Sequence, residues 1–183
     1  KVGIFLLDTR THDYVHGMKQ GDREAFELCY QDISPTIYSA ILRICMNRDI
    51  ADDLLHDTFI KIFENIHSFD EQLSFIAWAK RISFNLTFNF IKKASNRRHE
   101  KIDESMLLSS ISLVESSFSN ENLIAVLFDD ITERERLILW LFIVEQYTHD
   151  EISLIVERSA SYSKSILSRA LKKIKQHEEV IKD

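Results

Sequence analysis

The sequence predicts an all-α protein made of two small helical domains joined by a flexible linker. Three observations predict this fold class. The 183 residues include only three glycines and one proline, which is too little turn chemistry for a fold of many short strands. Apolar residues recur at spacings of three and four, the period of helices with one buried face. A polar, serine-rich stretch separates two groups of such helices.

The first group contains four predicted helices. Asp22 is placed to cap the helix that opens REAFELCYQDI. Pro35 suits the first turn of the next helix, TIYSAILRICM. Either Asp49 or Asp52 could cap the third helix. The loop HSFDEQLS follows, and its last residue, Ser74, is predicted to cap the fourth helix.

The second group has stronger local signals. Thr132 with Glu135, and Thr148 with Glu151, each match the capping box that opens a helix. Ser159 is placed to cap a third helix after a turn of only two residues. A helix, a short turn and a second helix form the helix-turn-helix arrangement.

These signals predict the domain boundaries. We expect an N-terminal extension at residues 1–12, a first domain at 13–95 and a linker at 96–121. The second domain is expected at 122–178 and a short tail at 179–183.

Composition narrows the class of protein. The net charge is −6, so nucleic-acid binding would have to depend on local patches rather than on a global field. Cys29 and Cys45 match no disulfide or metal-binding spacing and are predicted to be reduced core residues. No apolar run reaches the length of a membrane span, and the opening KVGIFLLDTRT is not typical of a signal peptide. We therefore expect a cytoplasmic protein.

Charge is segregated along the chain. Residues 49–71 are mostly acidic, residues 80–101 mostly basic, and residues 158–175 contain six Lys and Arg residues and no acid. A charged run is commonly just a solvated helix face. Two basic helices, one of them second in a helix-turn-helix, favour nucleic-acid surfaces instead.

The basic stretch at 75–93 also carries five aromatic residues. At 100° per residue, one face is predicted to bury the helix: Phe75, Trp78, Ala79, Ile82, Leu86 and Phe90. The opposite face is then surplus and suits single-stranded nucleic acid, whose bases stack on aromatic rings: Lys80, Phe84, Thr87, Phe88 and Ile91. The alternative is that these rings pack on a neighbouring helix and leave only the charges and amides exposed.

The last helix presents short polar side chains away from its apolar residues. Ser161, Tyr162 and Ser165 lie on this polar side, with Lys164 and Arg169 beside them. Such side chains could reach base edges and phosphates in a major groove.

Taken together, these segments resemble bacterial sigma factors of the small, extracytoplasmic-function (ECF) type. ADDLLHDTFIKIF (51–63) is similar to the acidic segment of that family, and MKQGDREAFELCY (18–30) to its opening. The pattern Phe-x-x-Trp-x-x-x-Ile-x-x-Asn, followed by a basic pair, falls on Phe75, Trp78, Ile82, Asn85 and Lys92–Lys93. Residues 131–175 match the second domain, with its E-x-x-S-x-x-E-I-A core at Glu145, Thr148, Glu151, Ile152 and Ser153.

The resemblance implies three binding surfaces. Contact with the β′ clamp helices of core RNA polymerase would fall on Asp52, Asp53, Leu54, Asp57, Phe59, Ile60 and Lys61. Recognition of the −10 element and of its melted non-template strand would fall on Phe69, Lys80, Arg81, Asn85, Asn89, Lys92 and Lys93. Recognition of the −35 duplex would fall on Arg158, Ser159, Ser161, Tyr162, Lys164, Ser165, Arg169 and Lys172.

It also implies the partners: core RNA polymerase through its clamp helices and β flap, promoter DNA, and an anti-sigma factor. Three departures from the family pattern stand out. Asn89 replaces an Asp, Lys92 and Lys93 replace Arg, and the turn has Glu157 and Arg158 where a Gly and an apolar residue are usual. If residue 157 must adopt a left-handed backbone conformation, the strain energy is about 1–2 kcal/mol.

Three other interpretations compete with this resemblance. A sigma-like decoy would bind an anti-sigma protein without reading promoters, and a plain helix-turn-helix regulator would bind duplex DNA as a dimer. An enzyme is disfavoured because His12 and His16, four residues apart, have no third metal ligand nearby. We therefore expect no catalytic residue, no metal and no cofactor.

Overall fold

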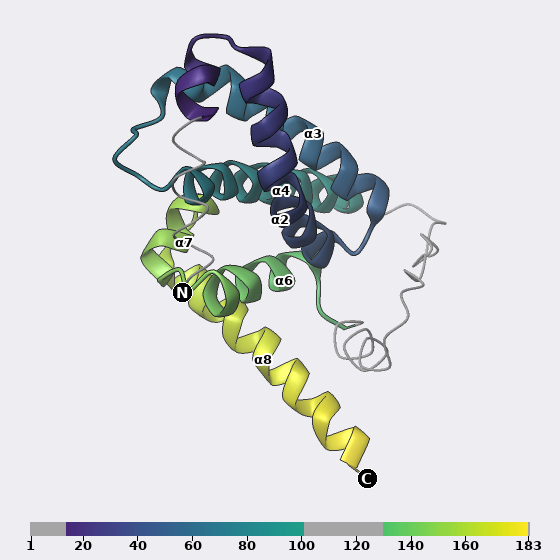
Figure 1. The fold of residues 1–183 in the computed structure, drawn as a ribbon. Helices are drawn as coiled ribbons and strands as arrows, with labels where there is room; N and C mark the ends of the chain where they lie inside the picture. The colour runs from purple at the N-terminus through teal and green to yellow at the C-terminus, as the bar shows by residue number, and fades with distance from the viewer. Residues whose placement is uncertain (1–13, 101–129, 183) are drawn as a thin grey trace. The chain divides into compact units, whose positions relative to one another are not determined.

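A computed structural model describes the backbone of residues 14–100 and 130–182, with side chains up to residues 96 and 176 of these ranges. The chain divides into two compact units, residues 1–87 and 88–183. Within the described ranges every regular element is helical, as the sequence predicts (Figure 1). The predicted N-terminal extension and residues 101–121 of the predicted linker lie outside these ranges.

The first unit opens with a short helix at residues 14–19. Gly21 then adopts φ +79°, and the Asp22 carboxylate accepts a hydrogen bond from the Glu24 N–H at 3.0 Å. This cap begins α2 (Arg23–Cys45), as predicted.

The prediction of two helices around Pro35 is wrong, because α2 runs through this residue without a break. Pro35 is exposed, so its ring and its missing N–H lie on the solvent side. On the other side Cys29, Ile33 and Ile37 form one stripe that is at most 2% exposed. Continuous burial of that stripe outweighs the local cost of the proline.

The cap of α3 (Arg48–Asn65) also differs from the prediction. Asn47 is the N-cap, and its side-chain oxygen accepts a hydrogen bond from the Ile50 N–H at 3.0 Å. Asp49 and Asp52 lie inside the helix and are exposed. The helix begins earlier than predicted because α2 already ends at Met46, which has φ +52°. α2 and α3 then pack side by side.

A 3₁₀ turn, η1 (Ile66–Ser68), and a loop lead to α4 (Phe75–Glu100). Ser74 precedes α4, and its side-chain oxygen lies 3.5 Å from the Ala77 nitrogen. α4 continues five residues past the predicted domain boundary at 95 and runs through the division between the two units.

The second unit contains α6 (Glu133–Leu139), the π-helical turn η2 (Trp140–Val144), α7 (His149–Ile155) and α8 (Ala160–Lys182). Both predicted capping boxes are present. The Ser159 hydroxyl accepts a hydrogen bond from the Tyr162 N–H at 3.3 Å, which confirms the third predicted cap. α8 packs against α6 and α7 and includes most of the predicted tail.

The turn between α7 and α8 closes as a Schellman motif. Glu157 is left-handed, with φ +48°, and the Arg158 N–H donates to the Ser153 carbonyl at 3.2 Å. The conditional prediction of strain at residue 157 therefore applies. The helix-turn-helix forms although this position carries a Cβ atom.

Both cysteines are buried and neither forms a disulfide, as predicted. Burial, assisted by the nearby Asp32 carboxylate, raises the pKa of the Cys29 thiol to about 12. Cys29 is thus a neutral core residue. In the described part of the chain, no helix combines the length and apolarity that a membrane crossing needs.

Candidate nucleic-acid and polymerase interfaces

One polar stripe runs along α4. Arg81, Asn85, Asn89 and Lys93 follow each other at intervals of four residues and therefore share one side of the helix. Arg81, Asn89 and Lys93 are exposed, whereas Asn85 is half-buried. The side-chain oxygen of Asn85 is buried and has no hydrogen-bond partner among the described residues. The stripe spans about 18 Å and offers cations and amides to a ligand.

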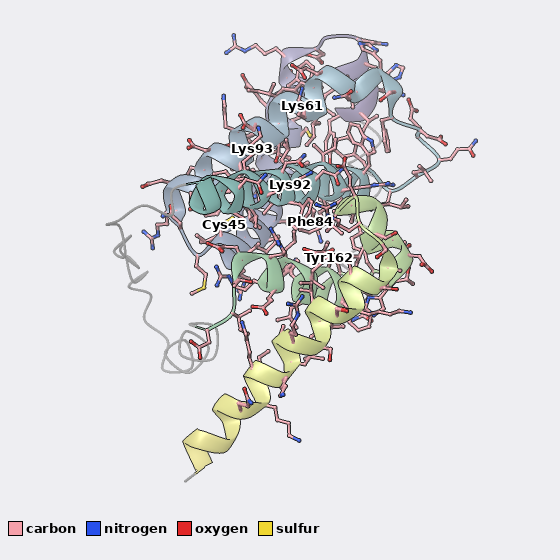
Figure 2. All side chains as sticks on the ribbon, turned by 180° about the vertical axis from the view of Figure 1, so that it is seen from behind. Cys45, Lys61, Phe84, Lys92, Lys93 and Tyr162 are labelled. Atoms are coloured by element: carbon pink, nitrogen blue, oxygen red, sulfur yellow. The ribbon has the colours of Figure 1, made fainter. Side chains whose placement is uncertain are left out.

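Lys80 and Lys92 lie beside this stripe and are half-buried, so all six α4 residues in the predicted −10 set reach the surface at least in part. Figure 2 marks Lys92 and Lys93 as neighbours on α4.

The prediction of a surplus aromatic face on α4 is wrong. Phe84 is 0% exposed, Phe88 2% and Ile91 4%. The alternative interpretation holds for Phe84 (labelled in Figure 2) and Phe88, which are core residues, whereas Trp78 and Phe90 are half-buried. The charges and amides remain as the surface that α4 presents.

Phe69, the remaining member of the predicted −10 set, is also buried. Its ring lies 5.2 Å from that of Phe75 and 5.1 Å from that of Trp78, measured between centroids. Tyr14 extends the cluster by an edge contact with Phe75 at 5.7 Å. In this conformation the Phe69 ring stabilises the loop and is not available to stack on a base. Leu73 in the same loop is 62% exposed.

Lys19, at the end of the first helix, holds this loop by two hydrogen bonds. Its ammonium donates to the Phe69 carbonyl at 3.1 Å and to the Glu71 carboxylate at 2.6 Å. Sequence reasoning missed this contact because Lys19 and Glu71 are 52 residues apart and neither belongs to a local motif.

The predicted polymerase-binding set divides between core and surface. Leu54 is 5% exposed and Phe59 3%, so both are core residues of the first unit. The other members are exposed on α3: Asp52, Asp53, Asp57, Ile60 and Lys61. Lys61 donates a hydrogen bond to the Glu64 carboxylate at 2.6 Å. This ion pair offsets the charge of Lys61, so the remaining exposed charge of α3 is predominantly acidic.

Tyr30 on α2 adds an aromatic side chain next to the α3 residues. Its ring centroid lies 4.6 Å from that of Phe59, yet Tyr30 is 45% exposed. The sequence analysis did not single out Tyr30. A signal was present, since Tyr30 lies off the stripe of Cys29, Ile33 and Ile37 that buries α2.

The predicted −35 residues share one accessible surface of the helix-turn-helix. Arg158 and Ser159 in the turn are exposed, and Tyr162, labelled in Figure 2, is half-exposed. The remaining members are exposed along α8: Ser161, Lys164, Ser165, Arg169 and Lys172. The buried face of α8 holds Ile166, Leu167 and Ala170, as predicted, but the separation is incomplete, because Leu171 is 45% exposed and Ser163 is buried.

Lys173 has a structural role despite its place in the basic run. Its ammonium donates to the Asp130 carbonyl at 2.9 Å and to the Glu135 carboxylate at 2.8 Å. Burial alone would raise the pKa of Glu135, but hydrogen bonds from Lys173 and Thr132 outweigh it and hold that pKa below its usual value. The capping box of α6 and the ion pair to α8 thus meet at one carboxylate.

By its architecture the chain is an all-helical protein of two units, the second a helix-turn-helix. Comparison with protein families also gives two parts, although the first match extends past residue 87, where the first unit ends. The model of sigma-70 region 2 matches residues 29–97, and the model of sigma-70 region 4 matches residues 127–176. Together they match more than half of the chain, which belongs to the sigma-70 family and, by its relatives, to the ECF group.

Three of these relatives are ECF sigma factors. SigW of Bacillus subtilis is 36% identical over 76 residues, a match that spans 42% of this chain and 41% of SigW. SigX of the same organism is 21% identical over 172 residues, with 87% of both chains covered. The sigma-E factor of Haemophilus influenzae is 24% identical, covering 85% of this chain and 88% of its own.

Two solved structures share the fold. CnrH, solved with the cytosolic domain of CnrY, matches with a TM-score of 0.58 at 16% identity, over 93% of this chain and 98% of CnrH. RpoE of Bartonella quintana, solved with the anti-sigma factor NepR, matches with a TM-score of 0.58 at 18% identity, over 85% and 97%.

Proposed function

We propose that this ECF sigma factor binds core RNA polymerase through α3, captures the melted −10 strand with α4 and reads the −35 duplex with α8. The observation that carries the proposal is a pair of exposed basic helix faces, one on α4 and one on α8, in a chain of the sigma-70 family.

The polymerase contact is assigned to the acidic surface of α3. Asp52, Asp53 and Asp57 offer carboxylates at spacings of one and four residues, and Ile60 adds apolar area at 40% exposure. Such a surface suits a basic partner helix, because charge complementarity steers association and apolar burial stabilises the complex. The clamp helices of the β′ subunit are the proposed partner, with Tyr30 contributing from α2.

The −10 contact is assigned to the α4 stripe. Arg81 and Lys93 would pair with phosphates, while the amide of Asn89 and the amide nitrogen of Asn85 would bond to the edges of unstacked bases. Because Phe69, Phe84 and Phe88 are buried, this contact depends on charge and hydrogen bonds rather than on ring stacking. Steep salt dependence is the expected consequence.

The −35 contact is assigned to the polar face of α8. Short hydroxyl side chains at Ser161 and Ser165 allow close approach to a major groove, where Tyr162 and Arg169 would reach base edges and phosphates. Holding both DNA sites through one chain raises the effective concentration of the second contact.

An anti-sigma factor is the proposed regulator. The likeness of the fold to RpoE, which was solved in complex with the anti-sigma factor NepR, supports this assignment. The carboxylates of α3 and the exposed side chains of Tyr30 and Leu28 on α2 offer such a partner charged and apolar contacts.

The test is reconstitution. The purified chain is added to core RNA polymerase, and transcript starts are mapped on a library of genomic fragments. Discrete starts are expected, and they should vanish when Lys80→Glu and Arg81→Glu are combined, because two phosphate contacts become repulsive. Polymerase binding without any start would indicate a decoy. Absence of polymerase binding would contradict the proposal.

A further inference from the structure

A buried polar contact joins the two helices of the helix-turn-helix. Ser163 on α8 is 0% exposed, although its neighbours Ser161 and Lys164 are exposed. The Ser163 hydroxyl oxygen lies 2.7 Å from Nδ1 of His149, the first residue of α7. The two residues are 14 positions apart, so this hydrogen bond belongs to the tertiary structure.

The surrounding hydrogen bonds indicate which atom donates. The Ser163 oxygen also lies 3.1 Å from the Ala160 carbonyl, which can only accept. A hydroxyl has a single hydrogen, and giving it to Ala160 satisfies that carbonyl. The short contact with His149 is then satisfied if the ring carries its proton on Nδ1 and donates it to Ser163.

The plane of the His149 ring is held as well. The ring stacks on Phe142 of η2, with centroids 4.7 Å apart and an interplanar angle of 19°. One face of the imidazole therefore rests on the preceding helical turn, while its edge bonds to α8. Three consecutive elements of the unit meet at this one side chain.

The contact differs in kind from the packing around it. Ile152, Ile166 and Leu167 are buried apolar residues, and apolar contacts have little directional preference. A hydrogen bond of 2.7 Å restrains both distance and angle. Because Ser163 lies between Tyr162 and Lys164 in the first turns of α8, it restrains rotation of the helix where base contacts are proposed.

We propose that His149 is a positioning residue for the recognition helix. Its Nδ1–H···Ser163 bond sets the angle at which α8 presents Tyr162, Ser165 and Arg169 to duplex DNA. This inference rests on the proposed function, and it adds a residue outside the predicted −35 set.

The test compares specific with non-specific DNA binding. The full chain, assembled with core RNA polymerase, is titrated against a duplex carrying the −35 element found by start mapping and against a scrambled duplex. The Ser163→Ala variant should reduce the ratio of the two affinities about five-fold, the worth of one hydrogen bond. Affinity for the scrambled duplex should stay unchanged, because the exposed cations remain.

Two substitutions at position 149 provide matched controls. The amide nitrogen of Asn reaches about as far as Nδ1, so His149→Asn should keep the ratio within about two-fold of wild type. His149→Gln places its amide farther out, and this variant should behave like Ser163→Ala. A long-range ¹H–¹⁵N spectrum of the free chain should find the ring proton on Nδ1.

Each of the following three outcomes would contradict a specific part of the proposals. If wild type does not distinguish the two duplexes, both the proposed function and this inference fail. If wild type distinguishes them and Ser163→Ala does so equally, only the inference fails, even if the variant melts at a lower temperature. A proton found only on Nε2 would overturn the assigned direction of the bond.

Discussion

The two basic helices use their surfaces differently. α4 carries five aromatic residues, none of them fully exposed, and shows solvent a stripe of cations and amides. α8 buries small and aliphatic side chains and shows solvent a row of hydroxyls with cations. Exposed cations therefore mark the candidate DNA surface in both helices, whereas the buried rings of Phe75, Phe84 and Phe88 on α4 do not.

The largest expected effect tests the role of the α4 rings. Phe84→Ala should lower the free energy of unfolding by about 3–5 kcal/mol, because it leaves a cavity at a side chain that is 0% exposed. Urea unfolding measures this loss. Arg81→Ala on the same helix is the matched control and should change stability by less than about 0.5 kcal/mol. A stable Phe84→Ala variant that binds single strands weakly would restore the stacking interpretation.

The next effect tests the structural role of Lys173, which the proposal distinguishes from the DNA-facing cations of α8. Glu135→Gln should cost about 1–2 kcal/mol at neutral pH, since the carboxylate loses its charge-assisted bond with Lys173. The pKa of Glu135 is lowered in the folded chain. Its contribution is therefore complete above the usual carboxyl pKa and lost as pH falls through the folded value. The stability difference between wild type and variant should shrink on acidification, and a constant difference would refute this account.

A smaller effect concerns the turn that leads into α8. Glu157→Gly should raise the free energy of unfolding by up to about 1 kcal/mol, because glycine adopts φ +48° without a Cβ clash. Glu157→Ala keeps the Cβ and should give no gain. Thermal unfolding of the three proteins in one buffer measures the difference. A loss of stability in the glycine variant would mean that the Glu157 side chain makes a contact worth more than the strain.

The smallest effect compares two adjacent lysines. Lys172 is exposed, so Lys172→Ala should reduce the slope of log affinity for promoter duplex against log salt by about one unit. Lys173→Ala should leave that slope unchanged, because its ammonium is engaged with Glu135 and Asp130. Equal changes in slope would contradict the division of roles within α8.

Local motifs account for what the sequence could predict. The capping boxes at Thr132 and Thr148 and the cap at Asp22 involve residues two or three positions apart. The local sequence alone therefore predicts their geometry.

Features decided by tertiary packing could not be predicted in this way. Pro35 breaks a helix on local grounds, but a buried stripe that spans both sides of it keeps α2 continuous. The sequence of α4 has two apolar faces, and the pattern does not indicate which of them is buried. The contacts of Lys19 with Glu71 and of His149 with Ser163 join residues that no local pattern links.

The most direct test of the division between α4 and α8 uses two templates and two variants. One template is a −35 duplex alone, and the other is a pre-melted −10 bubble without a −35 element. With core RNA polymerase, the Arg81→Glu and Lys93→Glu pair on α4 should lose affinity for the bubble and keep it for the duplex. The Arg169→Glu variant on α8 should show the reverse. Equal losses on both templates for either variant would contradict the account.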